Sequence, residues 1–141
     1  MFTLVDSNVI LDVITDDPEW ADWASEALSR VAEESTLAIN PIIYAEVSIQ
    51  LRTIEDLNDL VPDEDFRRLD LPYEAAFLAG KAFLAYRRRG GSKAMPLADF
   101  YIGAHAAVSG MRLLTRDARR YRTYFPTVPI IAPDRVSRAA R

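Results

Sequence analysis

Short apolar runs alternate along this chain with longer segments in which apolar residues recur every three or four positions. Four of the runs predict short, buried parallel strands at residues 2–5, 36–39, 112–115 and 128–131. A further strand is expected at 69–71. Strands this short, with apolar residues on both faces, belong inside a sheet that helices cover on both sides.

The longer segments carry helical spacing. We expect helices at residues 7–15, 18–34, 41 to about 52, 72–89, 97–109 and 117–124, with one or two short polar helices in 55–68 that Pro62 interrupts. Asn40 precedes Pro41 as a helix cap, and Gly110 ends the segment 97–109. Strands that alternate with helices predict an α/β fold, a three-layer α/β/α sandwich around a central parallel sheet of four to five short strands.

Length and composition favour one domain. The chain has 141 residues, half of them hydrophobic, which is enough for a single core. We expect that domain to span residues 1–133, followed by a basic tail at 134–141. The chain lacks cysteine, which suits a reducing compartment, and its first residues resemble neither a signal peptide nor a membrane span. The expected location is therefore the cytoplasm, without a membrane anchor.

Charge is distributed unevenly between the two halves. Residues 1–75 contain 18 acidic and 4 basic residues, whereas residues 76–141 contain 3 acidic and 13 basic ones. This division predicts either a polyanionic ligand or a partner of complementary charge. The basic residues cluster at Arg87, Arg88, Arg89 and Lys93, and again between residues 112 and 122. Arginine at the end of a helix also suits the helix dipole, so a purely structural role for either cluster remains open.

Four carboxylates occupy positions next to apolar segments, namely Asp6, Glu46, Asp99 and Asp117. A buried charge is unfavourable unless a cation or a metal ion compensates it. The chain has a single histidine and no cysteine, which argues against zinc and other metals that prefer nitrogen or sulfur. The remaining candidate is a hard divalent cation bound by oxygen, Mg²⁺ or Mn²⁺.

Two of these acids follow predicted strands. Asp6 ends the first strand and Asp117 comes just after the fourth, so both should lie at the edge of the sheet where ligands bind in parallel α/β folds. Each could equally cap the helix that follows it. Asp99 stands in the first turn of a helix, where an acid interacts favourably with the helix dipole whether or not it has another role.

Glu46 is harder to explain as a surface residue. It shares a helix face with Ile42, Ile43 and Ile49, and no Lys or Arg lies three or four positions away. A carboxylate on a core-facing stripe is a candidate metal ligand or general base. The lone His105 lies six positions after Asp99, about 120° away round the helix, and we interpret it as a packed or surface residue.

Four sequence segments together resemble the PIN-domain family, and more specifically the VapC-type ribonuclease toxins of bacterial toxin–antitoxin pairs. They are Val-Asp-Ser-Asn-Val-Ile-Leu-Asp (5–12), Pro-Ile-Ile-Tyr-Ala-Glu-Val (41–47), Pro-Leu-Ala-Asp-Phe-Tyr-Ile-Gly-Ala-His-Ala (96–106) and Leu-Leu-Thr-Arg-Asp-Ala-Arg-Arg-Tyr (113–121). Each segment alone is a weak signal, but their order and spacing are specific. The resemblance extends over residues 2 to about 132.

The resemblance implies an endoribonuclease that uses Mg²⁺ or Mn²⁺ and acts as the toxin of such a pair. The implied catalytic and metal-binding acids are the four already named. Asn8 and Thr115 match polar residues that support those acids or contact phosphate, while Arg87, Arg88, Arg89, Lys93 and Arg116 are candidates for RNA binding. Family members are usually homodimers, and a small antitoxin protein blocks the groove. A further acid found in some members is absent here, which leaves the number of metal ions open.

Other readings fit the sequence less well. A haloacid-dehalogenase-like site would need a second Asp where Asn8 stands, and a response-regulator receiver would need a late Lys, whereas no Lys follows Lys93. The remaining alternative is a catalytically idle PIN-like module that binds RNA or protein. The loss of one of the four acids would indicate such a module, and all four are present.

Overall fold

The computed structural model describes residues 1–91 and 96–133, which form one five-stranded sheet and seven helices. All strand pairs are parallel, and the strand order is β3-β2-β1-β4-β5. The strands are β1 (Phe2–Val5), β2 (Thr36–Ile39), β3 (Arg67–Arg68), β4 (Arg112–Leu114) and β5 (Ile130–Ile131). In the centre of the sheet, Leu4 of β1 pairs with Ala38 of β2 on one side and with Leu113 of β4 on the other.

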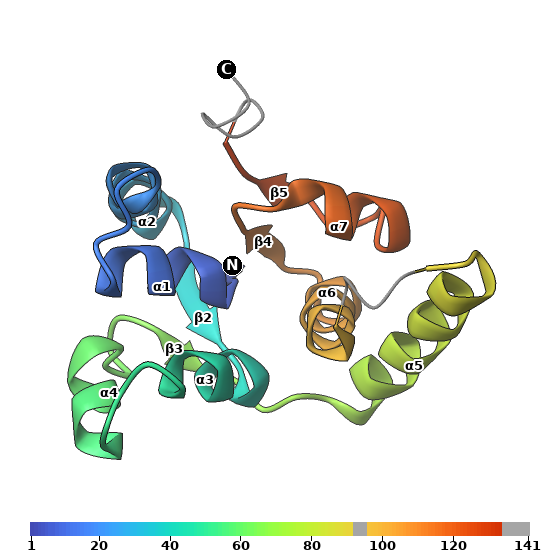
Figure 1. The fold of residues 1–141 in the computed structure, drawn as a ribbon, viewed down its shortest axis with the longest axis horizontal. Coiled ribbons are helices and arrows are strands. Elements are labelled where there is room, and N and C mark those ends of the chain that lie inside the picture. The colour runs from blue at the N-terminus through green and yellow to red at the C-terminus, as the bar shows by residue number, and fades with distance from the viewer. Residues whose placement is uncertain (92–95, 134–141) are drawn as a thin grey trace.

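The helices connect these strands and form two groups. They are α1 (Ser7–Ile14), α2 (Ala21–Glu34), α3 (Pro41–Ser48), α4 (Ile54–Leu60), α5 (Tyr73–Arg88), α6 (Leu97–Ser109) and α7 (Ala118–Tyr124). In Figure 1, α1 to α4 gather on one side together with β2, and α5 to α7 gather on the other, with β4 between the two groups. This arrangement confirms the predicted α/β fold.

Most element boundaries agree with the pattern of the sequence, and four depart from it by two residues or more. The helix predicted from 41 to about 52 ends at Ser48, and the strand predicted at 128–131 is only Ile130–Ile131. The predicted strand at 69–71 is wrong: β3 is Arg67–Arg68, and the ladder continues only as far as the bond from Leu69 N to Ile39 O (2.9 Å). The helix predicted to begin at residue 18 begins at Ala21. The reason is a turn in which the Asp17 carboxylate accepts the backbone N–H groups of Glu19 and Trp20.

The core joins the sheet to α6. Leu4, Val5, Leu113 and Leu114 are fully buried in the two central strands. On α6, Phe100 is fully buried and stands at the centre of a group of aromatic rings, with Phe83, Tyr86, Tyr124 and Phe125 at centroid distances of 5.4 to 6.3 Å. This cluster connects α5, α6 and the end of α7, and so fixes the helices that carry Asp99 and Asp117.

Among residues 1–91 and 96–133, no helix is both long enough and apolar enough to span a bilayer. The predicted basic tail at 134–141 and Lys93 lie outside the described residues.

Candidate active site

The neighbouring strands β1 and β4 end side by side, and the connections that follow them run to opposite sides of the sheet. From β1 the chain continues to its neighbour β2, whereas from β4 it continues to β5 on the opposite side of the sheet. Ligands of parallel α/β folds bind at this kind of position, beyond the carboxyl ends of the strands. A bond from Asp6 N to Leu114 O (2.9 Å) holds the end of β1 against β4.

Asp6 is the most deeply buried acid at this edge, with only 3% of the residue exposed. Its Oδ2 accepts hydrogen bonds from the hydroxyl groups of Thr115 and Tyr121, both at 2.8 Å, and a longer one from Asn8 Nδ2 at 3.4 Å. Asp6 occupies the N-cap position of α1, but its carboxylate forms no capping bond to that helix. Its bonds instead connect β1 to the segment after β4.

Burial raises the pKa of Asp6 from 3.8 to about 6. The hydrogen bonds from Thr115 and Tyr121 oppose this shift, whereas the charges of Asp99 and Glu46 add to it. Burial, the Asp6 charge and its hydrogen bond also raise the pKa of the Tyr121 hydroxyl well above its usual value, so Tyr121 remains a donor to Asp6. These effects place three acids within electrostatic range of one another.

Glu46 reaches the same region from α3, but the apolar helix face predicted around it is only partly present. Ile49 is 79% exposed and lies beyond the end of α3, so it does not extend a core-facing stripe. Glu46 is half-buried, and its Oε1 accepts a hydrogen bond from Ser7 Oγ at 2.7 Å. Burial raises its pKa, the bond from Ser7 opposes the rise, and the charge of Asp99 adds to it.

Asp99 and Asp117 share a cation that the sequence analysis did not identify. Arg120 donates from its NH1 group to Asp99 Oδ2 (2.6 Å), and its Nε forms an ion pair with Asp117 Oδ2 (3.0 Å). Burial raises the pKa of Asp99, while the hydrogen bond and charge of Arg120 lower it and the charge of Asp117 raises it. Asp117 makes no side-chain capping bond to α7, so its ion pair replaces the capping role considered from the sequence.

All four acids line one cavity of about 220 Å³. The complete lining consists of Asp6, Ser7, Asn8, Glu46, Pro96, Asp99, Arg116, Asp117, Arg120 and Tyr121. The four carboxylates thus come from four separate parts of the chain and meet at the carboxyl ends of β1 and β4. Thr115 does not line this cavity, but its hydroxyl group orients Asp6 and accepts from Asp117 N at 3.1 Å.

The donor atoms suit a hard divalent cation. The cavity presents carboxylate, hydroxyl and amide oxygens, the ligand set that Mg²⁺ and Mn²⁺ prefer. In the part of the chain that the structure describes, however, no three Asp, Glu or His side chains are grouped closely enough to hold an ion as they stand. Two of the four acids face Arg120 instead. The chemistry of the site fits a metal ion, and binding would require the side chains to move.

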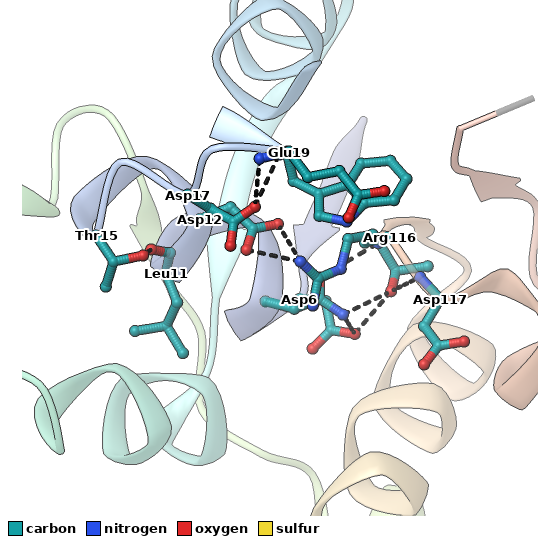
Figure 2. A network of polar contacts seen from close by, with 11 residues as sticks. Asp6, Leu11, Asp12, Thr15, Asp17, Glu19, Arg116 and Asp117 are labelled. Atoms are coloured by element: carbon teal, nitrogen blue, oxygen red, sulfur yellow. Dashed lines mark hydrogen bonds and ion pairs between the residues drawn. The ribbon is translucent and has the colours of Figure 1, made fainter. Parts of the chain in front are cut away.

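Arg116 is held by a second network, next to the cavity (Figure 2). Its NH1 group contacts both oxygens of Asp12, at 2.8 and 3.0 Å, and its guanidinium lies 5.6 Å from the ring centroid of Trp20. Its backbone N–H donates to Asn8 Oδ1 at 3.2 Å. Burial raises the pKa of Asp12 to about 6 against the opposing effect of Arg116. Arg116 therefore ties the segment after β4 to α1.

The other candidate RNA-binding residues that the structure describes are three arginines outside the cavity lining. Arg87 and Arg88 belong to the last turn of α5, Arg89 caps it, and all three are exposed. Arg87 lies against the Phe83 ring and Arg89 against the Tyr124 ring, at 5.9 and 5.7 Å from the centroids. They form a basic surface at the end of α5 that does not contribute to the cavity lining.

Sequence reasoning missed three residues of the site, Ser7, Arg120 and Tyr121. The available signal was spacing, because Arg120 and Tyr121 stand three and four positions after Asp117 and so share its side of a helix. The sequence left His105 as either a packed or a surface residue, and the structure shows that it is packed. It is 1% exposed, its Nδ1 pairs with Asn40 Nδ2 at 3.0 Å, and burial lowers its pKa.

Comparisons with known proteins place this arrangement in context. The family model described as the PIN domain matches residues 3–126. A search of curated protein sequences gave no match. Among solved structures, the chain is similar to VapBC2 from Rickettsia felis bound to a DNA fragment from its promoter, with a TM-score of 0.72, 18% identity and coverage of 94% of this chain and 98% of that one.

Two further structures show the same fold. One is VapBC-1 from nontypeable Haemophilus influenzae, with a TM-score of 0.71, 16% identity and coverage of 94% and 98% of the two chains. The other is FitAcB from Neisseria gonorrhoeae, with a TM-score of 0.65, 21% identity and coverage of 95% and 99%. At these identities, the likeness establishes the fold along nearly the whole of both chains.

Proposed function

The chain belongs to the PIN-domain family, and from this premise we propose that it is a metal-dependent endoribonuclease acting as the toxin of a toxin–antitoxin pair. The observation that supports the proposal best is the convergence of Asp6, Glu46, Asp99 and Asp117 on one cavity. Four carboxylates in a shared cavity repel one another, and such an arrangement favours the binding of a divalent cation.

The residues of the chain have distinct parts in this proposal. Asp6, Asp99 and Asp117, with Glu46, would hold Mg²⁺ or Mn²⁺. When bound, the ion would supply positive charge to the scissile phosphate and promote ionisation of the attacking water. Thr115 and Tyr121 hold the Asp6 carboxylate in one orientation through their hydroxyl groups.

Glu46 is our candidate for orienting the attacking water or taking its proton. The raised pKa of Glu46 brings the carboxylate closer to the range in which a general base is effective. Its hydrogen bond to Ser7 fixes one of its oxygens, and the residue lines the cavity. A carboxylate in this position can accept a proton from a water molecule in the cavity.

The partners follow from the charge distribution and from the structural neighbours. RNA is the proposed polyanion, and the basic surface of Arg87, Arg88 and Arg89 together with Lys93 would guide it to the cavity. Several structural neighbours are toxin–antitoxin complexes. We therefore propose a cognate antitoxin that covers the cavity, a homodimeric toxin, and a cytoplasmic location.

The direct test is RNA cleavage by the purified protein with Mg²⁺ or Mn²⁺, with and without EDTA. Cleavage should require the ion and should fall at least about a hundredfold in Asp6→Asn and Asp99→Asn, because each loses a charged ligand. Asp22→Asn is the matched control, since it makes the same change at an exposed residue on α2. Cleavage that survives EDTA would contradict the proposal, and RNA binding without cleavage would indicate an idle binding module.

The chemical ends of the products provide an independent check. Hydrolysis by an activated water leaves 5′-phosphate and 3′-hydroxyl ends, whereas attack by the 2′-hydroxyl leaves a 2′,3′-cyclic phosphate. The only histidine, His105, is buried and paired with Asn40, so the chain offers no histidine pair for the second route. Detection of cyclic phosphate ends by mass spectrometry would refute this part of the mechanism.

A further inference from the structure

Arg120 occupies an unexpected position for a residue beside a proposed cation site. Its guanidinium contacts one oxygen of Asp99 and one oxygen of Asp117 through two different nitrogens, at 2.6 and 3.0 Å. Both acids belong to the four carboxylates that line the cavity. A single side chain of the protein therefore bridges two of the groups proposed to hold the metal ion.

The environment of the two contacts makes them more than an exposed surface pair. The Asp99 side chain is 10% exposed, whereas those of Arg120 and Asp117 are 40% and 44% exposed. A buried carboxylate without a compensating cation is strongly unfavourable. Arg120 supplies that compensation, and the guanidinium group can do so for two acids at once because its donors point in several fixed directions.

The second arginine of the cavity is not available for the same purpose. Arg116 lines the cavity, but its NH1 group is bound to both oxygens of Asp12 and its guanidinium packs over Trp20. Arg120 extends from the short helix α7 and leaves 40% of its side chain in solvent. Its guanidinium can therefore leave the cavity without disrupting the core.

We propose that Arg120 is an internal counter-cation of this site, and that a divalent ion binds by displacing its guanidinium from Asp99 and Asp117. This inference rests on the proposed function for the location of the ion, and it adds a competitor carried by the chain itself. It explains why no three acids among the described residues are grouped to hold an ion as they stand. Two of them are turned toward a guanidinium instead.

Exchange of one cation for another has a measurable thermodynamic consequence. Every contact that Arg120 makes in the ion-free protein must be lost when the ion binds, so those contacts oppose metal binding. Removal of the guanidinium should therefore make the metal bind more tightly, although the ion-free protein becomes less stable. If Arg120 instead served to hold Asp99 and Asp117 in place for the ion, its removal would weaken metal binding.

The test is a calorimetric titration of the full chain, stripped with EDTA and dialysed, with Mn²⁺ alone. Arg120→Gln should bind Mn²⁺ about tenfold more tightly than the parent protein, since two partly buried contacts no longer compete. Arg119→Gln is the matched control because it removes the same charge from the same helix at an exposed residue. The control should change the dissociation constant by less than about twofold, as expected for an exposed charge.

Thermal unfolding gives a second readout that does not depend on RNA cleavage. In EDTA, Arg120→Gln should melt at a lower temperature than Arg119→Gln, and saturating Mn²⁺ should reduce the difference. Arg120→Lys serves if Arg120→Gln does not fold. Lysine keeps the positive charge but lacks the fixed, divergent donors of the guanidinium group, so this variant should bind Mn²⁺ with an affinity between those of the parent protein and Arg120→Gln. An affinity for Mn²⁺ in these Arg120 variants equal to or weaker than that of Arg119→Gln would overturn the inference.

The result is separable from the proposed function. Tighter Mn²⁺ binding by Arg120→Gln, together with a parent protein that fails to cleave RNA, would retain the exchange and refute the ribonuclease. Cleavage by the parent with no gain in Mn²⁺ affinity in Arg120→Gln would retain the ribonuclease and refute the exchange.

Discussion

Replacing Asp6 with asparagine should make the metal-free protein more stable at neutral pH, even though it should abolish activity. Asp6 is 3% exposed and lies within electrostatic range of Asp99 and Glu46. At neutral pH the ionised Asp6 carboxylate is therefore unfavourable in the folded protein, because it is buried and because Asp99 and Glu46 repel it. Asparagine keeps the shape of the side chain and an oxygen that can accept from Thr115 and Tyr121, but it carries no charge.

The magnitude follows from the pKa of Asp6, which is raised from 3.8 to about 6. Because the pKa in the folded protein is higher than in the unfolded chain, ionisation favours unfolding as the pH rises from about 4 to about 6. Above that range the penalty is complete and amounts to about 3 kcal/mol. The asparagine amide adds a donor that also needs a partner, at a cost of about 1 kcal/mol, so the expected net gain at pH 7.5 is about 2 kcal/mol.

The assay is urea unfolding of the parent and Asp6→Asn in EDTA, at pH 7.5 and again at pH 5. The ionisation penalty of Asp6, which is the pH-dependent part of the stability difference between the two proteins, should fall by about half at pH 5. At that pH much of the Asp6 population in the folded protein is protonated. His105 has a lowered pKa and titrates in the same way in both proteins, so its contribution cancels. Asp22→Asn, at an exposed residue of α2, should show neither the gain nor the pH dependence.

A difference between Asp6→Asn and the parent that stays constant between pH 7.5 and pH 5 would refute this reasoning. It would mean that the Asp6 charge is already compensated in the folded protein. A loss of stability that grows as the pH falls would refute it more strongly, because the sign would be opposite to that of a raised pKa.

Two further predictions concern the scaffold that holds the site. Arg116→Gln leaves the Asp12 carboxylate buried without its cation and should lower the free energy of unfolding by about 2 to 3 kcal/mol. Adding Asp12→Asn to this variant should recover most of the lost free energy of unfolding, measured by chemical denaturation. A double variant that is as unstable as Arg116→Gln alone would contradict the pairing. Gly103→Ala places a methyl group against the Phe125 ring and should cost about 1 to 3 kcal/mol in thermal unfolding. Gly80→Ala meets nothing within 4 Å on α5 and should be neutral or stabilising, so the reverse ranking would refute the packing argument.

Local patterns in the sequence were sufficient for most of the fold. The runs at 2–5 and 36–39 and the helix at 97–109 form as predicted, because burial on both faces and helical periodicity are properties of neighbouring residues. The third strand was misplaced by two residues. Its position depends on pairing with Ala38 and Ile39, which are distant in the sequence.

For the candidate site, too, local sequence patterns predicted one part and contacts between distant residues decided the rest. The sequence identified Asp6, Glu46, Asp99 and Asp117 as acids beside apolar segments, and the order of the strands brings them to one cavity. Their local explanations did not hold in every case. Asp6 and Asp117 occupy the N-cap positions of α1 and α7, but neither carboxylate makes a capping bond to its helix. Glu46 owes its setting to Ser7 rather than to Ile49.

The sequence by itself determined the class of the fold and singled out the four acids, and their oxygen ligands predict a hard divalent cation, because these inferences follow from residue type and local spacing. The tertiary structure alone decided which groups interact with each acid. Tyr121 donates to Asp6 across 115 positions and Arg120 reaches Asp99 across 21, and no local pattern encodes such contacts. Charge compensation depends on distances in space, so only the folded chain identifies Arg120 as the cation already beside the carboxylates.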